Sequence, residues 1–166
     1  MTMKNNYSYK LCVAPMMGHT DLHFRYLLRL ISKKTMLYTE MVASNSILHN
    51  KSKKLNKLER NKDNPVGFQL GGDNPEQLAE CAKIVESHGY NEINLNIGCP
   101  SKRAQSGNFG ACLFSQPELV AKCVDKISKS TSLPITVKTR LGIDNLDNIN
   151  YLKDFINTVS SSGVET

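Results

Sequence analysis

The sequence predicts an α/β chain that forms part of a (β/α)₈ TIM barrel, with about five of the eight strand–helix units. Three observations favour this fold class. Short apolar runs alternate with segments in which apolar residues repeat at helical spacing. Gly, Pro and polar residues cluster where the apolar runs end, and no GxGxxG motif comes after the first run. The alternation is typical of a parallel sheet with crossover helices. The polar residues at the strand ends favour a barrel over an open doubly wound sheet.

Five apolar runs have the length and composition of buried strands. They cover residues 10–15, 35–42, 66–70, 92–97 and 135–139. Four segments between and after them repeat apolar side chains on one helical face. These begin at Phe24, Leu78, Leu119 and Tyr151.

Local signals mark where these helices begin and end. Asn74 followed by Pro75 predicts an N-cap and a first helical residue, and Ser115 with Glu118 predicts a second N-terminus of the same kind. Gly89 is expected just beyond a helix end.

The length bounds the domain. A complete barrel takes about 250 residues, whereas this chain has 166. We expect a sixth strand to begin near Thr166, and therefore a truncated barrel rather than a finished domain.

Composition excludes several protein classes. With 40% hydrophobic and 22% charged residues, the chain is neither collagen-like nor disordered. No apolar run is long enough for a membrane span, and the polar segment Met1 to Lys10 predicts no secretory signal, so we expect a cytoplasmic protein. The net charge of +6 is compatible with a polyanion such as RNA. The densest basic patch comprises Lys51, Lys53, Lys54, Lys57, Arg60 and Lys62, which we interpret as a solvated face.

The five cysteines form no CxxC pair and no metal-ligand spacing with histidine. We expect free thiols and no metal site. Cys99 differs from the others because it follows a strand and stands between Gly98 and Pro100. An ordinary thiol is largely protonated at neutral pH and can donate a proton, whereas a thiolate attacks an electrophile. A buried structural cysteine is the alternative.

Two amides accompany Cys99 at the strand ends. Asn96 should share a strand face with Asn94 and Gly98, and Gln69 ends the third strand in the same layer. Buried amides require partners, which either loops or a heterocyclic ligand could supply. The Gln69 amide could both donate to and accept from a flavin or pyrimidine edge.

Lys138 lies within a predicted parallel strand, where burial of an ammonium group is costly. We expect it to meet an anion at the barrel mouth, such as a reduced flavin; an ion pair with Glu40 is the alternative. Pro15, Met16 and Met17 close the first strand and could approach a flat ring, although a hydrophobic turn explains them equally.

Together these motifs resemble the tRNA-dihydrouridine synthase family, and most closely its A-type bacterial branch. The resemblance runs from about Leu11 to Val164 through six motifs in order. They are Val13-Ala14-Pro15-Met16, Leu37-Tyr38-Thr39-Glu40-Met41-Val42, Gln69-Leu70-Gly71-Gly72, Glu92 to Ser101, Gly107 to Leu113, and Val137 to Gly142. The family usually has Asp where this chain has Gly18.

The resemblance implies an FMN-dependent reductase that uses NADPH to saturate the C5–C6 bond of a uridine in the tRNA D-loop, at positions 20 and 20a. It implies that Pro15, Met16 and Met17 line the flavin and that Gln69 and Lys138 bind its ring. Asn96 would contact the extruded uracil, and Cys99 would protonate C5.

The resemblance also implies what residues 1–166 lack. They would form the N-terminal part of an FMN-binding TIM-barrel domain, without the later barrel strands and the helical tRNA-binding domain. We expect a monomer when complete, with tRNA as partner and no membrane association, and low or no activity from this chain alone. The alternatives are a gene remnant or split-gene half that binds tRNA without catalysis, and a dihydroorotate-dehydrogenase-like FMN barrel.

Overall fold

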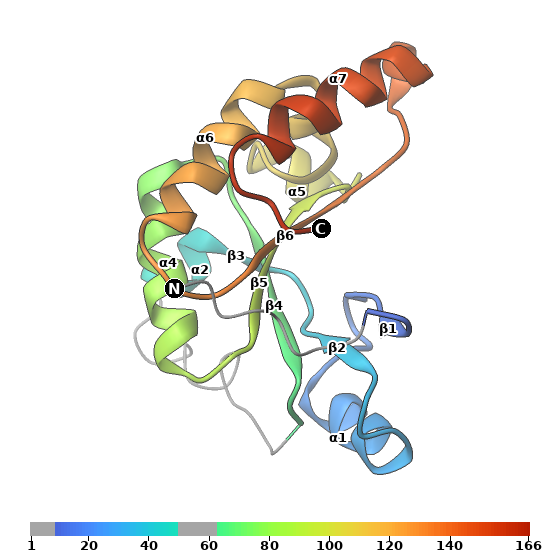
Figure 1. Ribbon diagram of the computed structural model, residues 1–166, viewed down its shortest axis with the longest axis vertical. Helices are drawn as coiled ribbons and strands as arrows, with labels where there is room; N and C mark the ends of the chain where they lie inside the picture. Colours follow the sequence, from blue (N-terminus) through green and yellow to red (C-terminus); the bar gives the residue numbers. More distant parts are fainter. Residues whose placement is uncertain (1–8, 50–62) are drawn as a thin grey trace.

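A computed structural model describes residues 9–49 and 63–166 (Figure 1). The basic patch between Lys51 and Lys62 lies outside the described residues. The six strands found in these two ranges form one sheet. They are β1 (Cys12–Val13), β2 (Met36–Tyr38), β3 (Val42–Ala43), β4 (Val66–Gly71), β5 (Glu92–Ile97) and β6 (Ile135–Thr139).

The order of the strands identifies the architecture. All pairs are parallel, and the sheet runs β1-β2-β4-β5-β6 in the order of the chain, with β3 paired to β4. A doubly wound sheet would reverse its strand order at a switch point, whereas a barrel adds each strand beside the previous one. The curled half-barrel therefore confirms the prediction of a partial TIM barrel.

The second predicted strand is interrupted. The sequence predicts one strand over 35–42, but β2 ends at Tyr38 and β3 begins at Val42. The Thr39 hydroxyl accepts a hydrogen bond from the Gln69 amide at 3.0 Å and donates to the Glu40 carbonyl at 2.8 Å. This side chain satisfies backbone groups that a regular ladder would pair, and the chain turns there.

Helices cover the outer side of the sheet. They are α1 (Leu22–Ile31), α2 (Ser44–Leu48), α4 (Pro75–Ser87), α5 (Lys102–Ser106), α6 (Pro117–Ser128) and α7 (Ile149–Ser160), with 3₁₀ segments at Gly110–Ser115 and Asp144–Leu146. Figure 1 shows α4, α6 and α7 following one another along one side, and α6 packs against both neighbours. Two helix ends match the sequence signals: the Asn74 side chain accepts from Gln77 N at 3.0 Å, and Gly89 has a φ of 75°.

The predicted start of α6 is wrong by one residue. Its N-cap is Gln116, not Ser115, because the preceding 3₁₀ segment runs through Ser115. The Ser115 hydroxyl donates to the Cys112 carbonyl at 2.8 Å instead of accepting from the helix. Pro117 then begins the helix, at a position where its missing N–H has no consequence.

Alternate residues along the strands face different surroundings. Phe68, Ile93 and Leu95 are fully buried in the core with helix residues such as Leu78 and Val124. Burial of each such side chain contributes about 1.5–3 kcal/mol. The intervening residues of β5 are the polar Glu92, Asn94 and Asn96, which are also buried. The inner face of the half-barrel is therefore polar, and the apolar outer face packs against the helices.

After α7 the chain returns to the edge of β6. The Glu165 amide donates to the Ile135 carbonyl, and the Val137 amide donates to the Thr166 carbonyl, both at 2.9 Å. These two bonds hold the residues after α7 alongside β6. None of the helices in the described ranges is long and apolar enough to cross a membrane.

Candidate functional site

The carboxyl ends of the strands surround a small cavity of about 170 Å³. The residues that line it come from the turn after β1, the segment before β3, and β4, β5 and β6 with the turn after β5. They are Pro15, Met17, Met41, Gln69, Asn96, Gly98, Cys99 and Lys138. Six of the seven site residues named from the sequence are thus brought together. Met16 lines neither this cavity nor the next one described; its backbone instead bonds Thr20 and shapes the turn.

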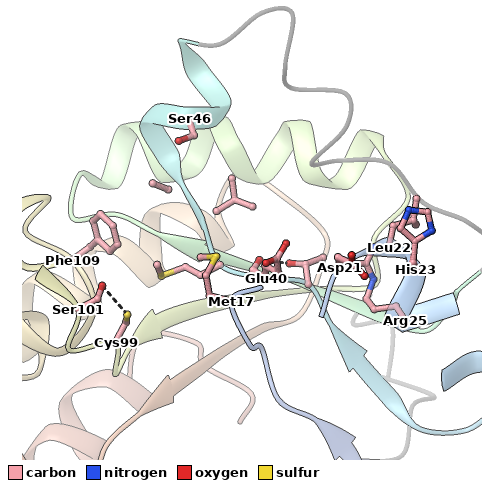
Figure 2. Close-up of a pocket in the computed structure, with 14 residues that line it drawn as sticks. Met17, Asp21, Leu22, His23, Arg25, Glu40, Ser46, Cys99, Ser101 and Phe109 are labelled. Carbon is pink, nitrogen blue, oxygen red and sulfur yellow. Dashed lines mark hydrogen bonds between the residues drawn. The ribbon is translucent and has the colours of Figure 1, made fainter. Parts of the chain in front are cut away.

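A second cavity, of about 680 Å³, shares Met17, Met41 and Cys99 with the first. Figure 2 shows Cys99, Ser101 and Phe109 at one end of it and Asp21, Leu22, His23 and Arg25 at the other. Its acidic groups already serve the local structure: Asp21 accepts from Phe24 N at 2.9 Å, and Glu40 accepts from Gly18 N at 2.5 Å. Cys99 therefore borders both spaces.

The turn that carries Cys99 is held by several hydrogen bonds. The Asn96 side-chain oxygen accepts from the amides of Gly98 and Cys99, at 3.0 and 2.9 Å. The Arg140 guanidinium donates to the Gly98 carbonyl at 2.7 Å. The Cys99 thiol donates to the Ser101 hydroxyl at 3.3 Å, and this bond is drawn in Figure 2. The half-buried sulfur is thus oriented as well as accessible.

The segment Gly110–Ser115 packs directly on this turn. The Ala111 amide donates to the Cys99 carbonyl at 2.9 Å. Gly110 has a φ of 78°, and a β-carbon there would lie 2.5 Å from the Cys99 carbonyl oxygen. Only glycine meets both conditions, because it tolerates positive φ and has no β-carbon.

The two predicted amides bond each other. The Asn96 Nδ2 donates to Gln69 Oε1 at 2.8 Å, and Gln69 Nε2 donates to Asn94 Oδ1 at 2.7 Å. Asn94 Nδ2 in turn donates to the Thr136 hydroxyl at 2.8 Å. Gln69 is 1% exposed and Asn96 is 9% exposed. Protein partners thus use part, but not all, of the hydrogen-bonding capacity of these amides.

A buried carboxyl group lies deeper in the half-barrel. Glu92 accepts hydrogen bonds from the hydroxyls of Thr136 and Tyr9, the second at 2.8 Å. Burial raises the pKa of Glu92, and hydrogen bonds from Thr136, Tyr9 and Tyr38 offset part of that rise. Burial and the nearby Glu92 raise the pKa values of Tyr9 and Tyr38, so both phenols stay protonated and act as donors.

The Lys138 side chain is exposed near the carboxyl end of β6, so the cost of burying an ammonium group does not arise. Among the described residues Lys138 takes part in no ion pair, and Glu40 bonds Gly18 instead. Lys138 thus lines the small cavity with its charge available.

Gly18, where the family usually has Asp, lies in a turn that suits glycine. Its φ of 76° is in the left-handed region, and its amide reaches the Glu40 carboxylate. Nothing lies within 4 Å of the position where a β-carbon would stand. The space could hold a side chain, so backbone conformation rather than crowding favours glycine here.

The sequence reasoning missed several residues that line these cavities, and three of them lie close to Cys99 or to the residues around it. They are Met41, which follows Glu40 near the end of the second predicted strand, Ser101, which follows Pro100, and Phe109, which precedes Gly110. The position of Met41 beside a strand end could have identified it. Phe109 approaches Cys99 only through the fold of the intervening loop, which no sequence periodicity reports.

Comparisons with known proteins match this arrangement. The family model described as dihydrouridine synthase covers residues 12–166. The chain is 52% identical over 155 residues to a protein of Synechocystis sp. named tRNA-dihydrouridine(20/20a) synthase, which covers 93% of this chain and 46% of that protein. Proteins of the same name from Salmonella typhi and Escherichia coli K12 are 53% and 52% identical, over 94% and 95% of this chain and 46% and 45% of their own lengths. The chain spans about half the length of these curated relatives.

Proposed function

The chain belongs to the dihydrouridine synthase family, and on that premise we propose that it carries the flavin-ring and proton-donor part of a tRNA-dihydrouridine(20/20a) synthase. The observation that carries the proposal is the position of Cys99, which borders two adjoining cavities. One cavity suits a flavin ring edge, and the larger one has room for an extruded base. The residues 1–166 would be part of the catalytic barrel, and the relatives' additional length would supply the rest.

The small cavity has the chemistry that a flavin ring needs. Gln69 keeps one N–H and one lone pair beyond its protein partners, which matches the alternating donors and acceptors of the ring edge. Lys138 supplies a cation, which favours the reduced and more negative form of a flavin. Pro15, Met17 and Met41 supply soft apolar surface for a flat ring. These residues therefore fit FMN. We propose NADPH as its reductant on the ground of family membership alone.

The proposed reaction adds one hydride and one proton across the C5–C6 bond of uridine. When bound and reduced, FMN supplies the hydride that reaches C6. The Cys99 thiol gives its proton to C5, which leaves the sulfur as a thiolate. Before the transfer, the Ser101 hydroxyl accepts a hydrogen bond from the Cys99 thiol at 3.3 Å. Because this hydroxyl keeps its own proton, it can rotate and donate a hydrogen bond to the thiolate. Solvent then restores the proton to Cys99.

The substrate must reach Cys99 outside a base stack. C5 and C6 of a stacked uridine are covered, so the base has to be extruded into a pocket. The larger cavity borders Cys99 and Ser101, and Phe109 offers an aromatic surface within it. The net charge of +6 favours tRNA, because phosphate contacts supply much of the affinity of such complexes. We propose that this takes place in the cytoplasm and that the complete enzyme is a monomer.

Flavin binding and base reduction test the proposal separately. Addition of the purified chain to FMN should quench flavin fluorescence, and NADPH with undermodified tRNA should then yield little or no dihydrouridine until the rest of the barrel is supplied. FMN binding without reduction would support a ring-binding part that needs the remaining barrel. Failure to bind FMN would contradict the proposal, and salt-sensitive tRNA binding without flavin would favour a non-catalytic RNA-binding protein. Orotate competing where tRNA does not would favour a dihydroorotate-type enzyme.

A further inference from the structure

The direction of the hydrogen bonds inside the half-barrel is determined at the Cys99 turn. The backbone amides of Gly98 and Cys99 can only donate, and both donate to Asn96 Oδ1, at 3.0 and 2.9 Å. These two bonds use both lone pairs of that oxygen. The amide nitrogen of Asn96 must therefore face the other way.

The orientation of Asn96 determines the direction of each hydrogen bond that follows. Asn96 Nδ2 donates to Gln69 Oε1 at 2.8 Å, so the Gln69 nitrogen must turn to the far side. It donates to Asn94 Oδ1 at 2.7 Å, and the Asn94 nitrogen then donates to the Thr136 hydroxyl at 2.8 Å. Reversal of Asn96 or Gln69 would set donor against donor or oxygen against oxygen at its bonds, and reversal of Asn94 would set its nitrogen against the Gln69 nitrogen.

This series of hydrogen bonds ends at a carboxyl group, which accepts a hydrogen bond. The Thr136 hydroxyl donates its proton to Glu92, whose other carboxylate oxygen accepts from Tyr9. Asn94 and Thr136 are 5% and 3% exposed, and Glu92 is fully buried. Because water cannot replace a lost partner at such positions, a broken link leaves an unsatisfied polar group. Backbone donors at one end and a carboxyl acceptor at the other thus impose the same direction on the whole chain.

This direction decides what Asn96 can offer to a ligand. Its oxygen has no lone pair left, and its nitrogen keeps one N–H beyond the bond to Gln69. Asn96 lines the small cavity. A ligand atom at Asn96 must consequently be an acceptor. Uracil and cytosine share a carbonyl at position 2 and differ at position 4, where uracil has a carbonyl oxygen and cytosine has an amino group that can only donate. An Asn96 that faces position 4 therefore distinguishes the two bases.

We propose that Thr136, Asn94 and Glu92 are positioning residues that hold the Gln69–Asn96 amide pair in one orientation, and that Asn96 thereby selects a pyrimidine with a carbonyl at position 4. This inference rests on the proposed function for the identity of the ligand. The orientation of the amides is a property of the protein alone, so the two can be tested apart.

The amide orientation is tested by NMR of the side-chain amide groups without ligand. Thr136→Val removes the hydroxyl and keeps the shape, and Thr136→Ser is the matched control that retains the hydroxyl. We expect the Val variant to shift the signals of Asn94, Gln69 and Asn96 in turn, and the Ser variant to leave them near their original positions. A shift confined to Asn94 would overturn the positioning role. If the Val variant does not fold, Glu92→Leu with Glu92→Gln as its control removes the acceptor of the Thr136 hydroxyl, one bond further along the same series of hydrogen bonds.

Ligand selection is tested with uridine monophosphate and cytidine monophosphate in the presence of FMN. We expect the uridine nucleotide to bind more tightly, and Thr136→Val to weaken its binding about tenfold while the cytidine nucleotide is little affected, since one hydrogen bond is at stake. Equal weakening of both would indicate general damage and overturn the selection by Asn96. If the unaltered protein binds neither nucleotide, the selection fails with the proposed substrate, and the NMR result alone decides the positioning role.

Discussion

The Cys99 carbonyl oxygen lies 2.5 Å from the point where a β-carbon at Gly110 would stand. The next residue is bonded to the same atom, because the Ala111 amide donates to the Cys99 carbonyl at 2.9 Å. The loop after α5 therefore supports the turn that presents the thiol. Several expectations concern this turn and the site around it.

Gly110→Ala should destabilise the protein and displace Cys99. Gly18→Ala is its matched control, since the two glycines have φ values of 78° and 76° but only Gly110 is crowded. Positive φ alone costs about 1–2 kcal/mol, and the collision should add about 1–3 kcal/mol at Gly110. Urea unfolding measures both variants. Equal losses of unfolding free energy would mean that the contact with Cys99 is relieved at no cost.

Cys99→Ala should abolish uridine reduction in the flavin-loaded complete enzyme while FMN remains bound. Loss of a general acid typically lowers the rate by about 10²–10⁴-fold. Cys12→Ala is the control, because Cys12 is an exposed thiol that lines neither cavity. Dihydrouridine yield and flavin absorbance report the two properties separately. Undiminished reduction by the Cys99 variant would remove this thiol from the mechanism.

Lys138→Ala should weaken FMN binding by about tenfold, the equivalent of one charge-assisted hydrogen bond. Lys126→Ala is the control, because Lys126 pairs with Glu76 at 3.3 Å and lines neither cavity. Fluorescence titration gives both dissociation constants. If the two variants bind FMN alike, Lys138 does not touch the flavin.

Asp63→Ala should lower the unfolding free energy by about 3–5 kcal/mol, because it leaves the buried Arg25 without its anion. The pair is formed at 2.8 Å, with side-chain exposures of 5% for Arg25 and 0% for Asp63. Asp125→Ala removes an exposed ion pair with Lys129 and should cost about 0–1 kcal/mol. Denaturant unfolding compares them. A loss below 1 kcal/mol at Asp63 would show that another group replaces the carboxylate.

Cys123 should resist alkylation in the folded protein. Burial, with smaller effects of Asp73 and Glu76, raises its pKa to about 12, so about one molecule in ten thousand carries the thiolate at pH 8. The exposed Cys12 should react with iodoacetamide before Cys123 does, as mass spectrometry would detect. Because the folded state keeps a proton that the unfolded state loses above about pH 9, Cys123 should also make the unfolding free energy fall between about pH 9 and 12. Rapid labelling of Cys123 at pH 8 would contradict its burial.

The polar residues at strand ends were predictable as a group. Each follows a recognisable apolar run, and in a parallel sheet such ends meet at one edge. Gln69, Asn96, Cys99 and Lys138 do line one cavity. Their partners were not predictable, because the bond between Asn96 and Gln69 depends on the register of β5 against β4, which pairs Asn94 with Gln69.

Other local details also depended on neighbours. Ser115 has the composition of an N-cap, but the 3₁₀ segment before it uses its hydroxyl. Thr39 is of a residue type common in strands, yet its hydroxyl accepts a hydrogen bond from the backbone amide of Gln69 in place of a regular strand-to-strand bond. In both cases a hydroxyl found a partner that the local sequence does not specify.

The sequence alone determined the alternation of strands and helices, the partial barrel and the thiol at the end of the fourth predicted strand, because periodicity and turn residues act over a few neighbours along the chain. The tertiary structure decided which way the buried amides point, that Lys138 is exposed, and that Gly110 supports Cys99. These depend on contacts between segments far apart in sequence, where strand register and the demand that every buried polar group be paired select one arrangement.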